Sequence, residues 1–169
     1  PQVSLRPERR PVTVLYCEFT AVENEEADEA LGRQDVLWET CSRIVRQFSG
    51  YVASTQGGGL LAYFGYPRAQ ERAARHAVQA ALAMTREAAP EVDIQVGVHS
   101  GLVIAGTQPD LPDALGRTSK LAARLRTGAS ANQVVISRQT FDIVAGYFDC
   151  ASLGLQQISG FSRSLEIFK

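Results

Sequence analysis

The residues best placed for chemistry are three basic side chains in the second half of the 169-residue chain. Arg117, Lys120 and Arg124 lie at positions i, i+3 and i+7, which puts them on one side of a helix. Guanidinium and ammonium groups in such a row suit the oxygens of a phosphate, with no need for a metal ion. The same spacing also fits a basic helix face that only contacts water, which is the commoner explanation. Both interpretations stay open.

Other reactive side chains give weaker signals. His76 falls within an expected helix and has no ligand partner at a useful spacing, so we expect it at the protein surface or its boundary. His99 invites a catalytic role, but we expect it to hold a turn by hydrogen bonds. Acidic residues crowd between positions 23 and 29 with few apolar neighbours, which predicts a solvated loop or a frayed turn in preference to a metal site.

The composition favours one well-packed domain in the cytoplasm. The chain is 45% hydrophobic, which is enough for one core at this length. Its net charge of −1, without a basic block, indicates neither a nucleic-acid nor a membrane partner. We find no apolar run of membrane-spanning length and no signal-peptide segment. The cysteines form no zinc or redox motif and are expected to be reduced core residues: Cys17, Cys41 and Cys150.

Hydrophobic spacing predicts alternating strands and helices after a linker over residues 1–10, within one domain over residues 11–169. Pro11–Phe19 is a nearly continuous apolar run, typical of a central strand buried on both faces. Ile94–Val98, His99-Ser100-Gly101 and Leu102–Gly106 predict a hairpin. Helices are expected over residues 34–49, 69–89, 115–127 and 138–145. A further strand is expected over 134–136, and candidate edge strands over 147–151 and 165–168.

A glycine-rich hairpin between Gly50 and Pro67 organises the chain. Tyr51–Gln56 and Leu60–Phe64 are short apolar runs on either side of Gly57-Gly58-Gly59, whose residues adopt the positive φ angles of a tight connection. Strands joined partly by hairpins favour an α+β fold, a ferredoxin-like sandwich with a mixed β-sheet and packed helices, over a doubly wound parallel fold.

This hairpin resembles a segment of class III adenylate/guanylate cyclase domains that reads Gly-Asp-Gly-Leu-Leu-Ala-Tyr-Phe-Gly-Tyr-Pro. Similar segments follow one another in the family's order at residues 9–17, 50–67, 121–125, 133–137 and 158–162. The resemblance covers nearly the whole chain. It implies the class III nucleotidyl cyclase fold and a head-to-tail dimer with two nucleotide sites along the subunit interface.

The resemblance also implies a two-metal site whose ligands are substituted in this sequence. The family holds two magnesium ions with two aspartates, one at the end of the first strand and one in the glycine turn. Glu18 stands at the first position with its carboxylate one methylene farther from the backbone, and Gly58 stands at the second and offers no ligand. Because magnesium needs near-ideal octahedral geometry, we expect no cofactor. Mg²⁺ or Mn²⁺ is expected only if the protein is an active cyclase.

The nucleotide positions implied by the resemblance are partly retained. Ser54 replaces a basic residue of the purine-binding half, and Lys120 replaces the asparagine that orients the ribose. Asp113 matches the position that reads adenine, and Arg124 matches the phosphate-binding arginine. Asp113, Ser54 and Arg117 are therefore the candidate nucleotide-binding residues. Arg124 and Lys120 stand at degenerate catalytic positions.

These substitutions lead us to interpret the chain as a pseudo-cyclase, a dimerising regulatory or nucleotide-sensing module in intracellular signal transduction. We expect a homodimer or a cyclase-type heterodimer, a flanking signalling domain, and ATP, GTP or another phosphate as the candidate ligand. A related prediction pairs Glu18 of one subunit with Lys120 of the other. The alternative is an active adenylate cyclase that converts ATP to cyclic AMP and pyrophosphate, either Mn-dependent or completed by a different subunit. Asp113 and Arg124 support that alternative.

Overall fold

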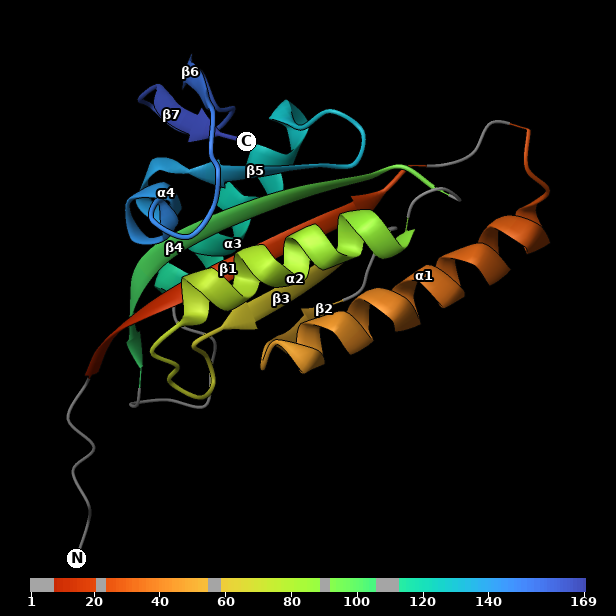
Figure 1. The fold of residues 1–169 in the computed structure, drawn as a ribbon, viewed down its shortest axis with the longest axis horizontal. Coiled ribbons are helices and arrows are strands. Elements are labelled where there is room, and N and C mark those ends of the chain that lie inside the picture. The colour runs from red at the N-terminus through yellow and green to blue at the C-terminus, as the bar shows by residue number, and fades with distance from the viewer. Residues whose placement is uncertain (1–7, 21–23, 55–58, 89–91, 106–112) are drawn as a thin grey trace, which may run out of the picture.

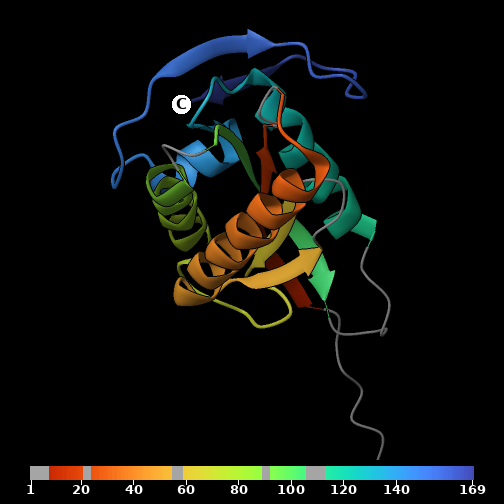
Figure 2. The ribbon, with the colours of Figure 1, turned by 90° about the vertical axis from the view of Figure 1, so that its right-hand side faces the viewer.

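The computed structural model describes residues 8–20, 24–54, 59–88, 92–105 and 113–169. Within these ranges the chain forms a seven-stranded mixed sheet in the order β2-β3-β1-β4-β5-β7-β6. Helices pack on both faces of this sheet, as Figure 1 and the view at right angles in Figure 2 show. The expected α+β fold is therefore confirmed.

Two long antiparallel strands form the middle of the sheet. β1 (Glu8–Phe19) pairs with β4 (Ile94–Ala105) along its whole length. β1 begins three residues before the apolar pattern indicated, because its first residues pair with the last residues of β4. The hairpin predicted around His99-Ser100-Gly101 is wrong, since β4 runs straight through these residues. His99 and Ser100 are buried and hydrogen-bonded, and Gly101 lies close to Thr118 of the helix that follows, so these residues pack on neighbouring elements and do not form a turn.

The two paired strands of the glycine-rich hairpin are confirmed on the outer side of β1, but Gly59 is the first residue of a strand and lacks the positive φ expected of it. β2 (Tyr51–Ser54) pairs antiparallel with β3 (Gly59–Phe64), and β3 pairs antiparallel with β1. The connection at residues 55–58, which includes Gly58, lies outside the described residues.

The two long helices α1 (Ala27–Gln47) and α2 (Ala73–Ala88) cover most of one face of the sheet, where the short helix α4 (Arg138–Val144) packs against α2 (Figure 1). α1 and α2 bury their apolar sides on β1, β3 and β4. α1 begins inside the acidic segment, so the prediction of a loop there is wrong from residue 27 onward. Asp28 and Glu29 lie in its first turn, where carboxylates are stabilised by the helix dipole. Cys17 and Cys41 are buried as free thiols in this layer.

One helix lies on the opposite face (Figure 2). α3 (Asp113–Leu125) continues into a short 3₁₀ turn, η1 (Arg126–Gly128). Leu121 and Leu125 form a small core with β5 and β7, and Ala122 packs in a second core against the middle of β1.

The C-terminal part completes the sheet with β5 (Gln133–Ser137), α4 (Arg138–Val144), β6 (Ser152–Gln156) and β7 (Leu165–Phe168). β5 runs parallel to β4, and β7 is antiparallel to β5. The strand expected at residues 165–168 is confirmed, but it lies between β5 and β6 and not at the edge of the sheet. The strand expected at residues 147–151 is wrong, because the edge strand is β6, whose mostly exposed side chains carry little apolar pattern.

Gly97 determines how closely α3 approaches the sheet. A Cβ atom at this position would lie 2.1 Å from the carbonyl oxygen of Ala122 and 2.8 Å from the backbone nitrogen of Arg126. Both atoms belong to the backbone, so neither can rotate away as a side chain would. The absence of a side chain at Gly97 therefore fixes the end of α3 and the start of η1 against β4.

We expect Gly97→Ala to lower the free energy of unfolding by about 1–3 kcal/mol, because α3 must move off the sheet to admit a methyl group. Urea denaturation followed by circular dichroism measures this loss. Gly116→Ala is the matched control, since a Cβ there meets nothing within 4 Å and alanine is the better helix former. Equal stability of the two variants would contradict the packing account.

Candidate functional site

The carboxylate at the expected metal position is bound by a cation of the same chain. Glu18, at the end of β1, forms an ion pair with Nη1 of Arg126 in η1. The side chains of Arg126 and Glu18 are only 24% and 30% exposed, so water screens the pair incompletely. Sequence reasoning missed Arg126 because it lies outside the basic row on α3, and no spacing rule connects it to β1.

Tyr16 completes this cluster on the same face of β1. The guanidinium carbon of Arg126 lies 5.6 Å from the centre of the Tyr16 ring, within the range of a cation–π contact. Burial raises the pKa of the Tyr16 phenol, and the nearby Glu18 carboxylate raises it further, so the phenol stays protonated at neutral pH. A Cβ on Gly59 would lie 2.5 Å from the Tyr16 hydroxyl oxygen. The phenol therefore lies directly over the start of β3.

These residues do not fit a two-metal site. The Glu18 carboxylate already binds a guanidinium, and the second expected ligand position is a glycine. Across the described ranges, no group of three His, Cys, Asp or Glu side chains could hold a metal ion. We therefore derive no chemical step through a metal.

The basic row on α3 is exposed to solvent, which agrees with both interpretations of its spacing. Arg117, Lys120 and Arg124 are all exposed. Arg124 donates from Nη1 to the carbonyl oxygen of Ser159 at 2.6 Å, which links α3 to the segment before β7. The prediction that Lys120 pairs with Glu18 of a second subunit is untested, and within the chain the partner of Glu18 is Arg126.

Ser54 and Asp113 are located only by their backbone. Ser54 is the last residue of β2 and Asp113 is the first residue of α3, and their side chains lie outside the described part of the structure. Their roles in nucleotide binding stay predictions.

His99 lies in the middle of β4 and holds no turn, which corrects the sequence interpretation. Its Nδ1 lies 2.7 Å from Oγ of Ser137, which caps α4. The hydroxyl groups of Ser137, Thr140, Ser100 and Thr13 then follow one another at 3.2, 3.0 and 2.8 Å. Burial lowers the pKa of His99 to about 4, so the ring is neutral at pH 7. This buried polar chain joins α4 to β4 and β1.

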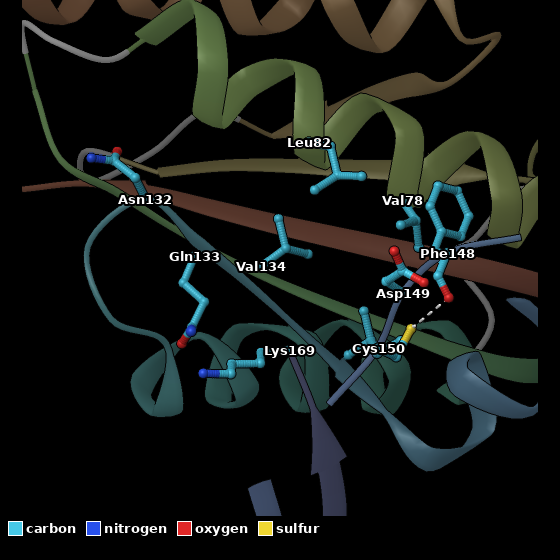
Figure 3. Close-up of a pocket in the computed structure, with 10 residues that line it drawn as sticks. Val78, Leu82, Asn132, Gln133, Val134, Phe148, Asp149, Cys150 and Lys169 are labelled. Atoms are coloured by element: carbon cyan, nitrogen blue, oxygen red, sulfur yellow. Dashed lines mark hydrogen bonds between the residues drawn. The ribbon is translucent and has the colours of Figure 1, made fainter. Parts of the chain in front are cut away.

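An apolar pocket lies on the face of the sheet that carries α2 (Figure 3). Its volume is about 290 Å³. Val78 and Leu82 of α2, Val134 of β5 and Phe148 supply much of its apolar lining, and Lys169 lies at its polar side. Of the predicted site residues whose side chains the structure describes, none lines it. The pocket is therefore separate from the Glu18 cluster, which lies on the α3 face.

Comparison with protein families identifies the chain. Residues 8–168 match the model of the adenylate and guanylate cyclase catalytic domain. The chain therefore belongs to this family and is a class III nucleotidyl cyclase domain. A search of curated proteins gives no significant match.

Solved cyclase domains share this fold at low sequence identity. The adenylyl cyclase CyaB from P. aeruginosa aligns with a TM-score of 0.85 and 22% identity, over 97% of this chain and 95% of that one. The guanylate cyclase domain of RhGC from Catenaria anguillulae, solved with GTP, gives 0.81 and 24%, over 94% of both chains. A non-canonical dimeric guanylyl cyclase domain of the RhoGC fusion protein from Blastocladiella emersonii gives 0.77 and 19%, over 96% of both chains. The RhoGC domain has also been crystallised as a monomer.

No helix within the described ranges has the length and apolar character needed to cross a membrane.

We expect the protein to become less stable on acidification, because the folded state favours the neutral form of His99. The unfolded chain takes up a proton near the ordinary pKa of 6.5, whereas the native protein resists protonation until about pH 4. The free energy of unfolding should therefore decrease between these pH values, by up to about 3 kcal/mol, and the loss is complete below the folded pKa. Urea denaturation at stepped pH measures this slope.

His99→Gln is the control, because an amide can hydrogen-bond to Ser137 and does not titrate. The slope assigned to His99 should be absent from this variant. The same slope in both proteins would show that other groups cause the acid sensitivity.

Proposed function

We propose that this chain is a catalytically degenerate class III cyclase domain, which dimerises and acts as a regulatory or nucleotide-sensing module for an attached signalling domain in the cytoplasm. The observation that carries this proposal is the ion pair of Glu18 with Arg126. It engages the carboxylate at the first metal position, while the second position is Gly58.

The reaction of the family explains why this loss matters. Forming a cyclic nucleotide requires the ribose 3′-hydroxyl to attack the α-phosphorus while pyrophosphate leaves, so negative charge builds up on both oxygens. Each preorganised group that stabilises such charge contributes a factor of roughly 10²–10³ to the rate. Substitutions at Glu18, Gly58, Ser54 and Lys120 affect several of these groups together. Turnover above background is therefore not expected.

An active adenylate cyclase is the second candidate. Two observations favour it: the chain is a member of the family, and Arg124 is exposed on α3 at the phosphate-binding position. In that case a different subunit or Mn²⁺ would have to supply what this chain lacks.

A nucleotide assay separates the two candidates. We expect the purified chain to produce no cyclic nucleotide from ATP or GTP with Mg²⁺ or Mn²⁺, because no pair of carboxylates is available to hold the ions. CyaB from P. aeruginosa, an adenylyl cyclase by its description, serves as the positive control. Product in proportion to the amount of pure protein would defeat the proposal. Combining Glu18→Asp with Gly58→Asp should then raise the activity from that measurable base.

The binding half of the proposal has its own test. The exposed Arg117, Lys120 and Arg124 favour a phosphate ligand. Dimer formation is proposed from the family resemblance, and the RhoGC domain occurs in crystals both as a non-canonical dimer and as a monomer. We expect calorimetry to give the same affinity for ATP or GTP in EDTA as in Mg²⁺, and charge reversal by Lys120→Glu to weaken binding. Sedimentation of the same samples reports the oligomeric state. Binding that requires Mg²⁺ would contradict the metal-free interpretation.

A further inference from the structure

Backbone packing fixes the position of Arg126. The backbone nitrogen of Arg126 lies against β4 at Gly97, which has no side chain, so η1 begins next to the central strands. Gly97 of β4 is paired with Tyr16 of β1, and Tyr16 lies two residues before Glu18. The side chain of Arg126 thus starts close to the carboxylate that it binds.

The Glu18 carboxylate is closely surrounded by this chain's own groups. On one side β1 pairs with β3, where Glu18 faces Gly59 and the Tyr16 phenol lies over that glycine. The guanidinium of Arg126 contacts both the Glu18 carboxylate and the face of Tyr16. A divalent ion that used Glu18 would have to displace Arg126 or approach its positive charge.

The Nε atom of Arg126 is buried and has no hydrogen-bond partner within the described part of the chain. Leaving such a donor unpaired is unfavourable, so the arrangement is not explained by hydrogen bonding alone. The ion pair and the ring contact must hold the guanidinium in place.

We propose that Arg126 is a tethered cation that takes the place of a divalent metal ion at Glu18. The guanidinium neutralises the carboxylate, as a metal would, and joins β1 to the end of α3. The cluster Tyr16–Glu18–Arg126 is therefore a metal-excluding site, and the state of the domain does not respond to Mg²⁺ or Mn²⁺. This inference deepens the proposed function and rests on it.

Mn²⁺ binding, followed by electron paramagnetic resonance of the free ion, tests the inference without any activity assay. The wild-type protein should bind no Mn²⁺ that depends on Glu18, so Glu18→Gln should give the same titration. Arg126→Gln exposes the carboxylate and should tighten Mn²⁺ binding by about tenfold or more. The double variant Glu18→Gln/Arg126→Gln should lose that gain.

Arg43→Gln is the matched control. It frees another carboxylate, Glu87, from a 2.8 Å ion pair on the surface, and it should create no Mn²⁺ site. Circular dichroism verifies that each variant is folded. If Arg126→Gln does not fold, the comparison of the wild type with Glu18→Gln can still overturn the inference, because Mn²⁺ binding that depends on Glu18 would show that Arg126 does not exclude the metal.

Two results would overturn the inference: wild-type Mn²⁺ binding that is lost in Glu18→Gln, or a folded Arg126→Gln that binds Mn²⁺ no better than the wild type. These failures are distinct from failure of the proposed function. Cyclic nucleotide formation would defeat the proposed function even if the Mn²⁺ titrations matched the expectation, and a bound ion at Glu18 without turnover would defeat only the inference.

Discussion

The close packing of α3 on β4 at Gly97 is the constraint on which the site depends. With the backbones of Ala122 and Arg126 in contact with this glycine, the end of α3 cannot shift along the sheet. The helix buries Leu121, Ala122 and Leu125 and presents its basic residues to solvent. The turn that follows then directs Arg126 toward the end of β1. A packing requirement in the core thus determines which charge meets Glu18.

The ion pair changes the electrostatics at the position where the family resemblance predicts a metal ligand. A half-buried carboxylate without a partner would attract a cation, and in this chain a covalently attached cation is already present. Because the Arg126 guanidinium is part of the chain, its local concentration at Glu18 is high and does not depend on the solution. The basic row on α3 adds further positive charge on the same face of the sheet. A site with this excess of positive charge suits an anionic ligand better than a divalent metal ion.

Much of the fold could be predicted from hydrophobic spacing, because β1, the glycine hairpin and the helices bury continuous or periodic apolar patterns. The prediction failed at His99-Ser100-Gly101, where small and polar residues resemble a turn but pack under α3 and α4 inside a long strand. It also failed for β6, whose exposed residues carry no pattern. Glu18 was found because a family motif marks it. Arg126 was missed because its partner lies far away in sequence and only the tertiary fold brings them together.

The central claim is that a guanidinium, and not a metal ion, lies against Glu18. A crystal grown with a nucleoside triphosphate analogue and Mn²⁺ tests it most directly, since the anomalous signal of manganese locates each ion. The account predicts the Arg126 guanidinium on the Glu18 carboxylate and no manganese peak beside it. Two ordered manganese ions at the subunit interface, with Glu18 as a ligand and Arg126 turned away, would contradict it.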